Sequence, residues 1–122
     1  MFRRSFLVSL SALMALRAAA AAPPPHEQAR IEKLIRFVEG QRDIKFIRNG
    51  TEYSSAEAGK FLRGKLEAMG QEVNTAREFI ERIASRSSMS GKPYEVKFAD
   101  GRMMLASQFL GAELKRLEGQ PV

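Results

Sequence analysis

The start of the chain has the pattern of a cleavable export signal, which limits how much of the chain remains to fold. Arg3 and Arg4 provide positive charge, residues 5–16 are mostly apolar, and residues 18–22 are all alanine, the small residue that signal peptidase accepts. The apolar run has 12 residues, whereas a membrane-spanning helix needs about 20. We therefore expect residues 1–21 to be removed and one domain of about a hundred residues to remain.

The signal also contains part of a twin-arginine motif. The arginine pair is followed two residues later by Phe6-Leu7, which is typical of signals that use the twin-arginine route. Phe2 before the pair and Val8 after it depart from the usual motif, so an ordinary Sec signal is the alternative. Either route predicts a periplasmic protein that contacts the membrane only during export.

The charge balance argues against nucleic acid as a partner. The chain has 20 Lys and Arg against 14 Asp and Glu. Arg3, Arg4 and Arg17 lie in the signal and no acidic residue does, so the exported part keeps 17 against 14, a net charge of +3. A nucleic-acid-binding protein concentrates its basic residues on one face, whereas acids and bases alternate here. We expect no nucleic-acid partner, and the oligomeric state stays open.

The exported part has no cysteine, so its stability has to come from packing rather than from disulfides. A domain of this size buries about 60–70% of the surface that its unfolded chain exposes, which is enough for one core. Three prolines stiffen a short lead over residues 22–28. We expect the single globular domain over residues 29–118 and a tail over residues 119–122.

Four segments have the apolar spacing of helices with one buried face. They begin near Glu27, Ser54, Thr75 and Ser107. Ser54 and Thr75 each precede a glutamate by three residues, which is the spacing of a capping box, and Ser107 is expected to cap the last helix. The expected buried faces are Ile31, Leu34, Ile35 and Val38; Ala58, Phe61, Leu62, Leu66 and Met69; Ala76, Phe79, Ile80, Ile83 and Ala84; and Phe109, Leu110, Leu114 and Leu117. The charged residues Lys60, Arg63, Lys65 and Glu67 lie largely off the second of these faces and are expected in solvent.

Short segments between these helices predict a small sheet. Residues 44–48 and 51–53 flank Asn49-Gly50, the strongest dipeptide signal for a tight hairpin turn. Residues 94–98 alternate with period two, as a half-buried strand does. The expected fold class is α+β and mainly helical, with about four helices and a small two- or three-stranded antiparallel sheet.

Several pieces of the chain, in this order and with these separations, resemble the YfeK-like family. The pieces are Phe46-Ile47-Arg48-Asn49-Gly50; Glu57-Ala58 with Leu62-Arg63 and Lys65; Thr75-Ala76-Arg77-Glu78-Phe79-Ile80; Ala84-Ser85; and Ser90-Gly91-Lys92-Pro93-Tyr94. The family comprises small exported proteins of Gram-negative bacteria with a domain of unknown function. The resemblance extends from about Ala29 to Leu117 and implies a periplasmic location, but no reaction. Relatives tend to carry histidine where this chain has Phe61, so no role of that histidine transfers here.

No catalytic or metal-binding constellation stands out in the sequence. The only histidine, His26, lies beside the cleavage site, and a metal site needs several converging ligands, so we expect no metal and no cofactor. A serine nucleophile needs a base within reach, which only Ser88 or Ser90 with Lys92 offers. We therefore expect no enzyme, with a small envelope hydrolase that uses glutamates or a Ser–Lys pair as the alternative.

Two polar loops supply the candidate binding site. If strands 44–48 and 94–98 pair, the loops that follow and precede them converge. Arginine and tyrosine are favoured binding anchors because they combine apolar area with directional donors. The candidate residues are Arg48, Asn49, Ser87, Ser88, Ser90 and Tyr94. The structural alternative is that Arg48 caps helix carbonyls and Tyr94 packs on the core with its hydroxyl outside.

The leading hypothesis is a non-enzymatic periplasmic binding or accessory module for an unknown protein or envelope ligand. Besides the hydrolase, a self-associating envelope stress protein is a second alternative. Self-association predicts an exposed apolar patch of several hundred Å².

Overall fold

The computed structural model describes residues 23–120. The expected signal peptide over residues 1–21, with its twin-arginine motif, lies outside the described residues, as do the last two residues of the expected tail. Among the described residues, no helix has both the length and the apolar character that crossing a membrane requires.

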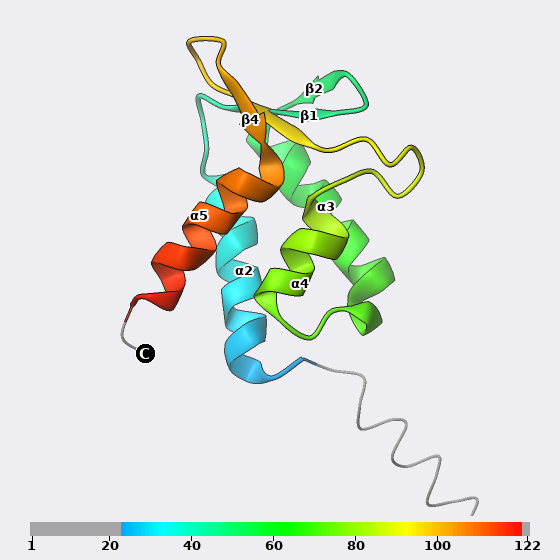
Figure 1. Cartoon of the computed structure of the whole chain (residues 1–122), viewed down its shortest axis with the longest axis vertical. Coiled ribbons are helices and arrows are strands. Elements are labelled where there is room, and N and C mark those ends of the chain that lie inside the picture. The colour runs from blue at the N-terminus through cyan, green and yellow to red at the C-terminus, as the bar shows by residue number, and fades with distance from the viewer. Residues whose placement is uncertain (1–22, 121–122) are drawn as a thin grey trace, which may run out of the picture.

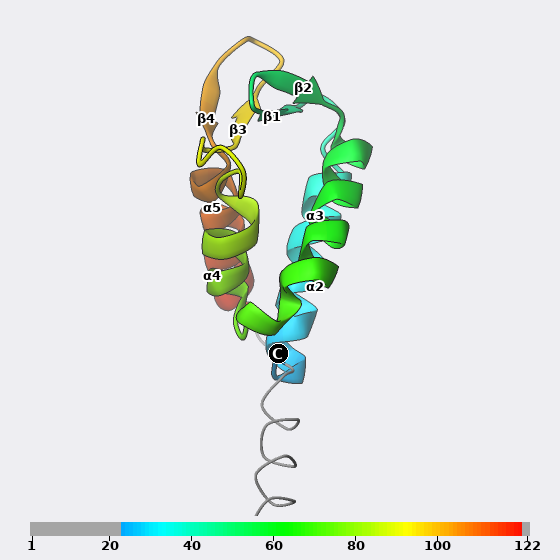
Figure 2. The same cartoon turned by 90° about the vertical axis from the view of Figure 1, so that its right-hand side faces the viewer.

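The helices form two layers, and a small sheet lies across one end of both (Figures 1 and 2). The first layer pairs α2 (Pro25–Glu39) with α3 (Ser55–Met69). In the second layer, α4 (Ala76–Phe79) continues as the π-helix η3 (Ile80–Ala84), which packs on α5 (Ala106–Glu118). A 3₁₀ turn, η2 (Gly70–Glu72), leads from α3 toward α4. The mainly helical α+β prediction is confirmed.

The sheet has four antiparallel strands in the order β2-β1-β3-β4. Their bounds are β1 (Lys45–Arg48), β2 (Thr51–Tyr53), β3 (Glu95–Lys97) and β4 (Met103–Leu105). The prediction of two or three strands was therefore one strand short. The unexpected strand is β4, whose Met-Met-Leu sequence lacks the alternation by which strands are recognised.

The apolar faces predicted from the sequence form the core between the two helical layers. The fully buried members include Leu34, Ile35 and Val38 of α2, Phe79 and Ile83 of the α4–η3 segment, and Leu114 of α5. On α3, Ala58 and Leu62 are buried, while Phe61 is only partly buried and lies toward the sheet. Phe61 therefore lies at the boundary between the core and the protein surface.

Two helices begin earlier than the sequence predicted. α2 begins at Pro25, inside the expected lead, because proline suits the first helical position, where its fixed φ is favourable and its missing N–H is not needed. α5 begins at Ala106, so Ser107 is not its cap. The Ala106 amide instead donates to the carbonyl of Tyr94 across the sheet, at 2.9 Å. A main-chain hydrogen bond across the sheet thus takes the place of the side-chain cap expected from Ser107.

The two predicted capping boxes have different outcomes. Ser54 makes both bonds of the box with Glu57. Thr75 makes one, because its hydroxyl accepts from the amide of Glu78, whereas the Glu78 carboxylate accepts from the amide of Asn74.

Charged side chains hold α2 against α3 along what we call the helix seam, formed by Glu32, Arg36, Glu39, Gly59 and Arg63. The Arg63 guanidinium donates to Glu32 at 2.8 Å and to Glu39 at 3.0 Å. Arg36 also donates to Glu32, at 3.0 Å. Hydrogen bonds from Arg63, followed by those from Arg36, lower the pKa of Glu32 to about 2. A Cβ atom at Gly59 would overlap the Glu39 side chain, so glycine permits this close approach.

Candidate functional site

Strands β1 and β3 pair as the sequence predicted, and their pairing brings two loops together. Phe46 lies opposite Val96 in an antiparallel register. The hairpin between β1 and β2 has Asn49 at φ 51° and Gly50 at φ 80°, the left-handed conformations that a two-residue hairpin turn requires. The turn therefore projects Asn49 toward the loop that precedes β3.

Asn49, Ser87 and Ser90 form a hydrogen-bonded loop junction. The Ser90 hydroxyl donates to the Asn49 side-chain oxygen at 2.5 Å, and the Asn49 amide donates to the Ser87 hydroxyl at 3.4 Å. Ser87 is buried, and its hydroxyl also accepts from the amides of Met89 and Ser90. The three predicted residues therefore meet, but their hydrogen-bonding groups are used on one another. The loop junction thus has a structural role, in holding the two loops together.

Ser88 lies apart from the loop junction. Its exposed hydroxyl approaches the sulfur of Met69 at the end of α3, at 3.9 Å. The neighbouring Met89 is 98% exposed at the tip of the loop. Of the six predicted residues, the structure therefore joins Asn49, Ser87 and Ser90 at the loop junction and keeps Ser88 apart from it. Arg48 and Tyr94 lie in the lining of a pocket beside α3.

Arg48 lies over aromatic rings rather than at a helix end. Its guanidinium carbon is 4.5 Å from the centroid of the Phe61 ring and 5.6 Å from that of the Tyr53 ring. Both distances suit cation–π attraction. No helix carbonyl among the described residues accepts a hydrogen bond from Arg48, so the expectation that it caps helix carbonyls was wrong.

Tyr94 is buried against Phe61 and meets a lysine that the sequence analysis placed in solvent. The two rings pack edge to face with their centroids 5.8 Å apart. The Lys65 ammonium donates to the Tyr94 hydroxyl at 3.1 Å and to the carbonyl of Arg86 at 2.9 Å. Tyr94 does pack on the core, but its hydroxyl accepts a hydrogen bond from the protein. We call Arg48, Tyr53, Phe61, Lys65 and Tyr94 together the cationic corner.

The two cations of the cationic corner lack acidic partners. None of the ion pairs among residues 23–120 involves Arg48 or Lys65. Burial lowers the pKa of Lys65, and the positive charge of Arg48 lowers it further. Burial also raises the pKa of Tyr94, an effect that the Arg48 charge opposes. The corner therefore combines a guanidinium and an amine group with a phenol.

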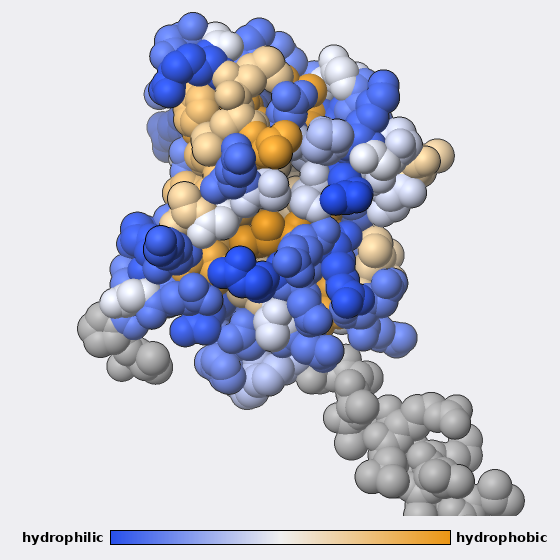
Figure 3. Space-filling view, in the orientation of Figure 1, coloured by the Kyte–Doolittle hydropathy of each residue, from blue (hydrophilic) through white to orange (hydrophobic). Residues whose placement is uncertain are grey.

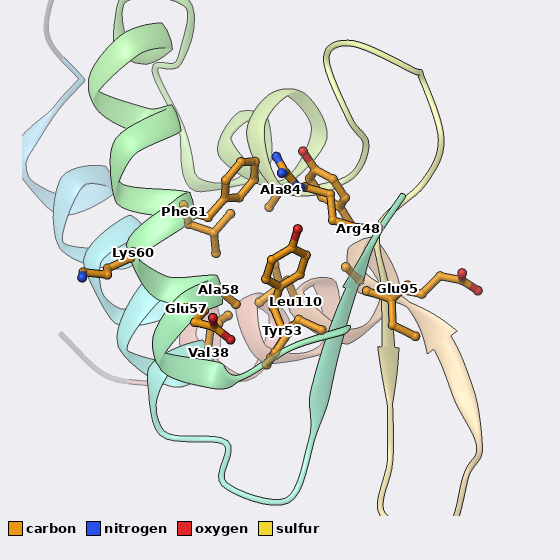
Figure 4. Close-up of a pocket in the computed structure, with 15 residues that line it drawn as sticks. Val38, Arg48, Tyr53, Glu57, Ala58, Lys60, Phe61, Ala84, Glu95 and Leu110 are labelled. Atoms are coloured by element: carbon orange, nitrogen blue, oxygen red, sulfur yellow. The ribbon is translucent and has the colours of Figure 1, made fainter. Parts of the chain in front are cut away.

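A pocket of about 360 Å³ opens beside the cationic corner, between α3 and the sheet (Figure 4). Its apolar lining comes from α2, β1, α3, η3 and α5, and includes Val38, Phe46, Ala58, Leu62, Ala84 and Leu110. Arg48, Phe61 and Tyr94 also line it, and the Tyr53 ring projects into it from the end of β2. Such an apolar cavity with a few polar groups at one side is typical of small-molecule sites.

The remaining charged residues of the pocket point away from its centre. Figure 4 shows the side chains of Lys60 and Glu95 extending outward on opposite sides. The Glu57 carboxylate accepts from the amide of Ser54 at 2.9 Å as part of the helix cap. Arg48 is therefore the charged side chain that faces the apolar space, beside the ring of Phe61.

Other chemistry has little support in the described part of the chain. No group of three or more His, Cys, Asp and Glu there could hold a metal ion. A nucleophilic serine needs a base within hydrogen-bond reach. Ser90 instead bonds to the Asn49 side chain and accepts from the amide of Lys92, and Ser88 meets a thioether.

Exposed apolar side chains are few and scattered. Among the described residues, the large exposed ones are Met89, Met103 and Leu105. Figure 3 shows pale apolar side chains over β4 and at the tip of the loop before β3, separated by polar surface. On β4, Leu105 adjoins the pocket lining, because it pairs with Glu95 and directly precedes Ala106.

The sequence analysis missed Tyr53, Phe61 and Lys65 as members of the site. A signal existed on α3, because Phe61 and Lys65 are four residues apart and so share one face of the helix. The resemblance had already singled out position 61 as a departure from relatives.

Comparisons with known proteins agree with the sequence motifs. A model of the family of unknown function DUF5329 matches residues 25–118. The chain is also similar to the uncharacterized protein YfeK of Salmonella typhimurium strain LT2, with 41% identity over 69 residues, or 57% of this chain and 58% of YfeK. The chain thus matches less than two thirds of that relative's length, and no solved structure matches it. The chain therefore belongs to DUF5329, the YfeK-like family of unknown function to which its motifs pointed.

Proposed function

We propose that the mature protein is a non-enzymatic periplasmic binding module that holds a small, largely apolar molecule in the pocket between α3 and the sheet. The observation that carries this proposal is the pocket of about 360 Å³, with apolar walls drawn from both helical layers. This volume lies near the lower end of the range of about 300–1,000 Å³ for small-molecule sites. The ligand is therefore smaller than a membrane lipid.

The fixed edges of the pocket support binding by a preformed site. β1 is bonded on both sides, to β2 and to β3, so the residues it contributes are held in place. The loop junction fastens the hairpin to the loop before β3 through Asn49. A preformed pocket loses less conformational freedom when a ligand binds, which favours affinity.

The enzymatic alternative would rest on Lys65, whose lowered pKa is the kind of shift that catalytic lysines show. Its surroundings favour a fixed cation. The ammonium donates to a main-chain carbonyl and to the Tyr94 hydroxyl, and both bonds favour the protonated form. Lys65 therefore fits a role in positioning charge better than a role as a nucleophile or base.

The experiment is an NMR titration of the mature protein with octanamide and octanoate, followed through backbone amide shifts. We expect saturable shifts that centre on the residues lining the pocket. Ala58→Leu should abolish them, because Ala58 lies in the pocket wall and a larger side chain fills the space. Ala68→Leu is the matched control, since Ala68 is exposed on the same helix and outside the lining.

Two results would overturn the proposal. One is the absence of saturable binding of either probe to the wild-type protein. The other is a set of shifts that Ala58→Leu leaves unchanged while its spectrum remains that of a folded protein.

The periplasmic location is tested separately by cell fractionation of the full chain. If export uses the twin-arginine route, replacing both Arg3 and Arg4 by lysine should block it. If the variant is exported normally, the signal belongs to the Sec route. Retention of the wild-type protein in the cytoplasm would overturn the periplasmic part of the proposal.

A further inference from the structure

Resting on the proposed function, we infer that the pocket ligand is a small apolar molecule that ends in one carboxylate, held by the cationic corner. The inference concerns the charge of the ligand, which the volume of the pocket does not determine. It depends on how Arg48 and Lys65 are placed relative to acids, rings and apolar space.

Arg48 has an unused hydrogen-bonding capacity. A guanidinium offers five N–H donors in a planar fork that matches a carboxylate. Among the described residues, Arg48 faces the rings of Phe61 and Tyr53 and forms no ion pair. Neither ring takes up these donors as a carboxylate would, so the fork remains available to an incoming acceptor.

Arg102, just before β4, shows that an arginine over an aromatic ring can still pair with an acid. Arg102 also lies over an aromatic ring, with its guanidinium carbon 5.0 Å from the centroid of Phe98. Its guanidinium nevertheless donates to the carboxylate of Asp100 at 2.8 Å. Arg48 also lies over an aromatic ring, beside the pocket, but no acid within residues 23–120 pairs with it.

Lys65 adds a second positive charge to the same corner. Two of its three donors are used, by the Tyr94 hydroxyl and the carbonyl of Arg86, which leaves one N–H donor. Its charge is close enough to that of Arg48 for the two to repel each other. An anion placed between them relieves this repulsion, whereas a neutral ligand does not.

The nearest carboxylates of the pocket do not cancel this charge. Glu57 is engaged with the amide of Ser54 in the helix cap, and Glu95 extends away from the pocket. Arg48 is therefore the lining cation that faces the apolar part of the cavity, and Lys65 adds its charge from outside the lining. This arrangement fits a carboxylate headgroup with an apolar body and disfavours cationic or zwitterionic ligands.

The test compares octanoate, octanamide and octylamine, which share a chain and differ in headgroup charge. We expect octanoate to bind about ten-fold more tightly than octanamide, as charge-assisted hydrogen bonds give, and octylamine to bind most weakly. Arg48→Met keeps the apolar stem and removes the charge, and it should reduce octanoate affinity to the level of octanamide. Arg102→Met is the matched control and should leave both affinities unchanged.

Further variants and outcomes keep the inference falsifiable. Arg48→Lys should retain part of the preference for octanoate, because it keeps the charge but loses the planar fork. Equal affinity of wild-type protein for octanoate and octanamide would overturn the inference while the proposed pocket stands. Binding of neither probe would overturn the pocket proposal and this inference with it. A preference that survives in Arg48→Met but not in Arg102→Met would place the anion site elsewhere.

Discussion

Arg63 of α3 and Arg48 of β1 both lie at contacts of α3 with its neighbours, and their surroundings differ. In the helix seam, Arg63 donates to two carboxylates of α2, Glu32 and Glu39. In the cationic corner, Arg48 lies over the rings of Phe61 and Tyr53 and near the like charge of Lys65, and no acid among residues 23–120 pairs with it. The seam provides each charge with an opposite charge, whereas the corner leaves two cations beside an open apolar pocket.

This difference in charge pairing indicates a different role for each region. A charge network that is complete within the chain fastens two helices and needs nothing from outside. A cation that is held in place without a partner adds little to stability and is available for a ligand. The helix seam is therefore a structural arginine site, and the cationic corner is the site that we propose to hold the ligand.

The largest expected difference between the two regions is in stability. Arg63→Met should lower the free energy of unfolding by about 1–2 kcal/mol, because half-exposed pairs contribute up to about 1 kcal/mol each and Arg63 makes two. Arg48→Met should lower it by less than about 1 kcal/mol, the value of an exposed cation–π contact, since the repulsion with Lys65 is also removed. Urea unfolding near neutral pH measures both. Equal losses would make Arg48 a structural residue like Arg63.

The approach of the two loops was predictable from the sequence, but the pocket was not. Asn49-Gly50 predicted the hairpin, and the alternation of residues 94–98 predicted the strand, so pairing β1 with β3 brought Asn49 toward Ser87. The contact of Arg48 with Phe61 depends on how α3 lies across the sheet, and residue spacing says nothing of that angle. Lys65 was assigned to solvent because charged helix residues usually are exposed.

The fold shows the same limit of prediction from sequence: local patterns are predicted, but contacts between distant segments are not. The helical faces were predicted because their spacing is local and regular, and most of their residues are buried, whereas Phe61, Leu66, Met69 and Phe109 are only partly buried. β4 was missed because three apolar residues in a row have no strand period, and it is recognised only through its bonds to β3. Ser107 was wrong as a cap because α5 begins at Ala106, whose amide donates to the main-chain carbonyl of Tyr94 beside β3.

A pair of glycines on α3 tests how closely the helix seam is packed. Gly64→Ala should raise the free energy of unfolding by about 0.5–1 kcal/mol, because alanine favours helix and its Cβ meets nothing within 4 Å. Gly59→Ala should be less stable than Gly64→Ala by about 1 kcal/mol or more, since its Cβ displaces the Glu39 side chain from Arg63.

Thermal or urea unfolding of the two glycine variants gives the comparison. As a control, Gly59→Ala in a Glu39→Ala background should recover the gain that alanine gives in a helix. If Gly59→Ala and Gly64→Ala are equally stabilising, α2 and α3 are not as close as the seam requires.

Acid should weaken the helix seam before it affects the cationic corner. The folded-state pKa of Glu32 is about 2, against an ordinary value of 4.5. Because the folded pKa is the lower one, its stabilisation is present above pH 4.5 and is lost as the pH falls toward 2. Glu32→Gln should therefore flatten the pH dependence of the free energy of unfolding in this window. The change should be small, because the Glu32 side chain is partly exposed to solvent. Parallel curves for variant and wild type would contradict the network.

The smallest expected effect is a shift in the titration of Lys65. Burial lowers its pKa first, and the charge of Arg48 lowers it further. Arg48→Met removes only the second cause, so the pKa of Lys65 should rise but stay below the usual 10.5. NMR of the lysine side chain across the alkaline range measures this, with Arg102→Met as the control that should change nothing. An unchanged pKa in Arg48→Met would mean that the two cations do not share one corner, and an anion would then have no reason to bridge them.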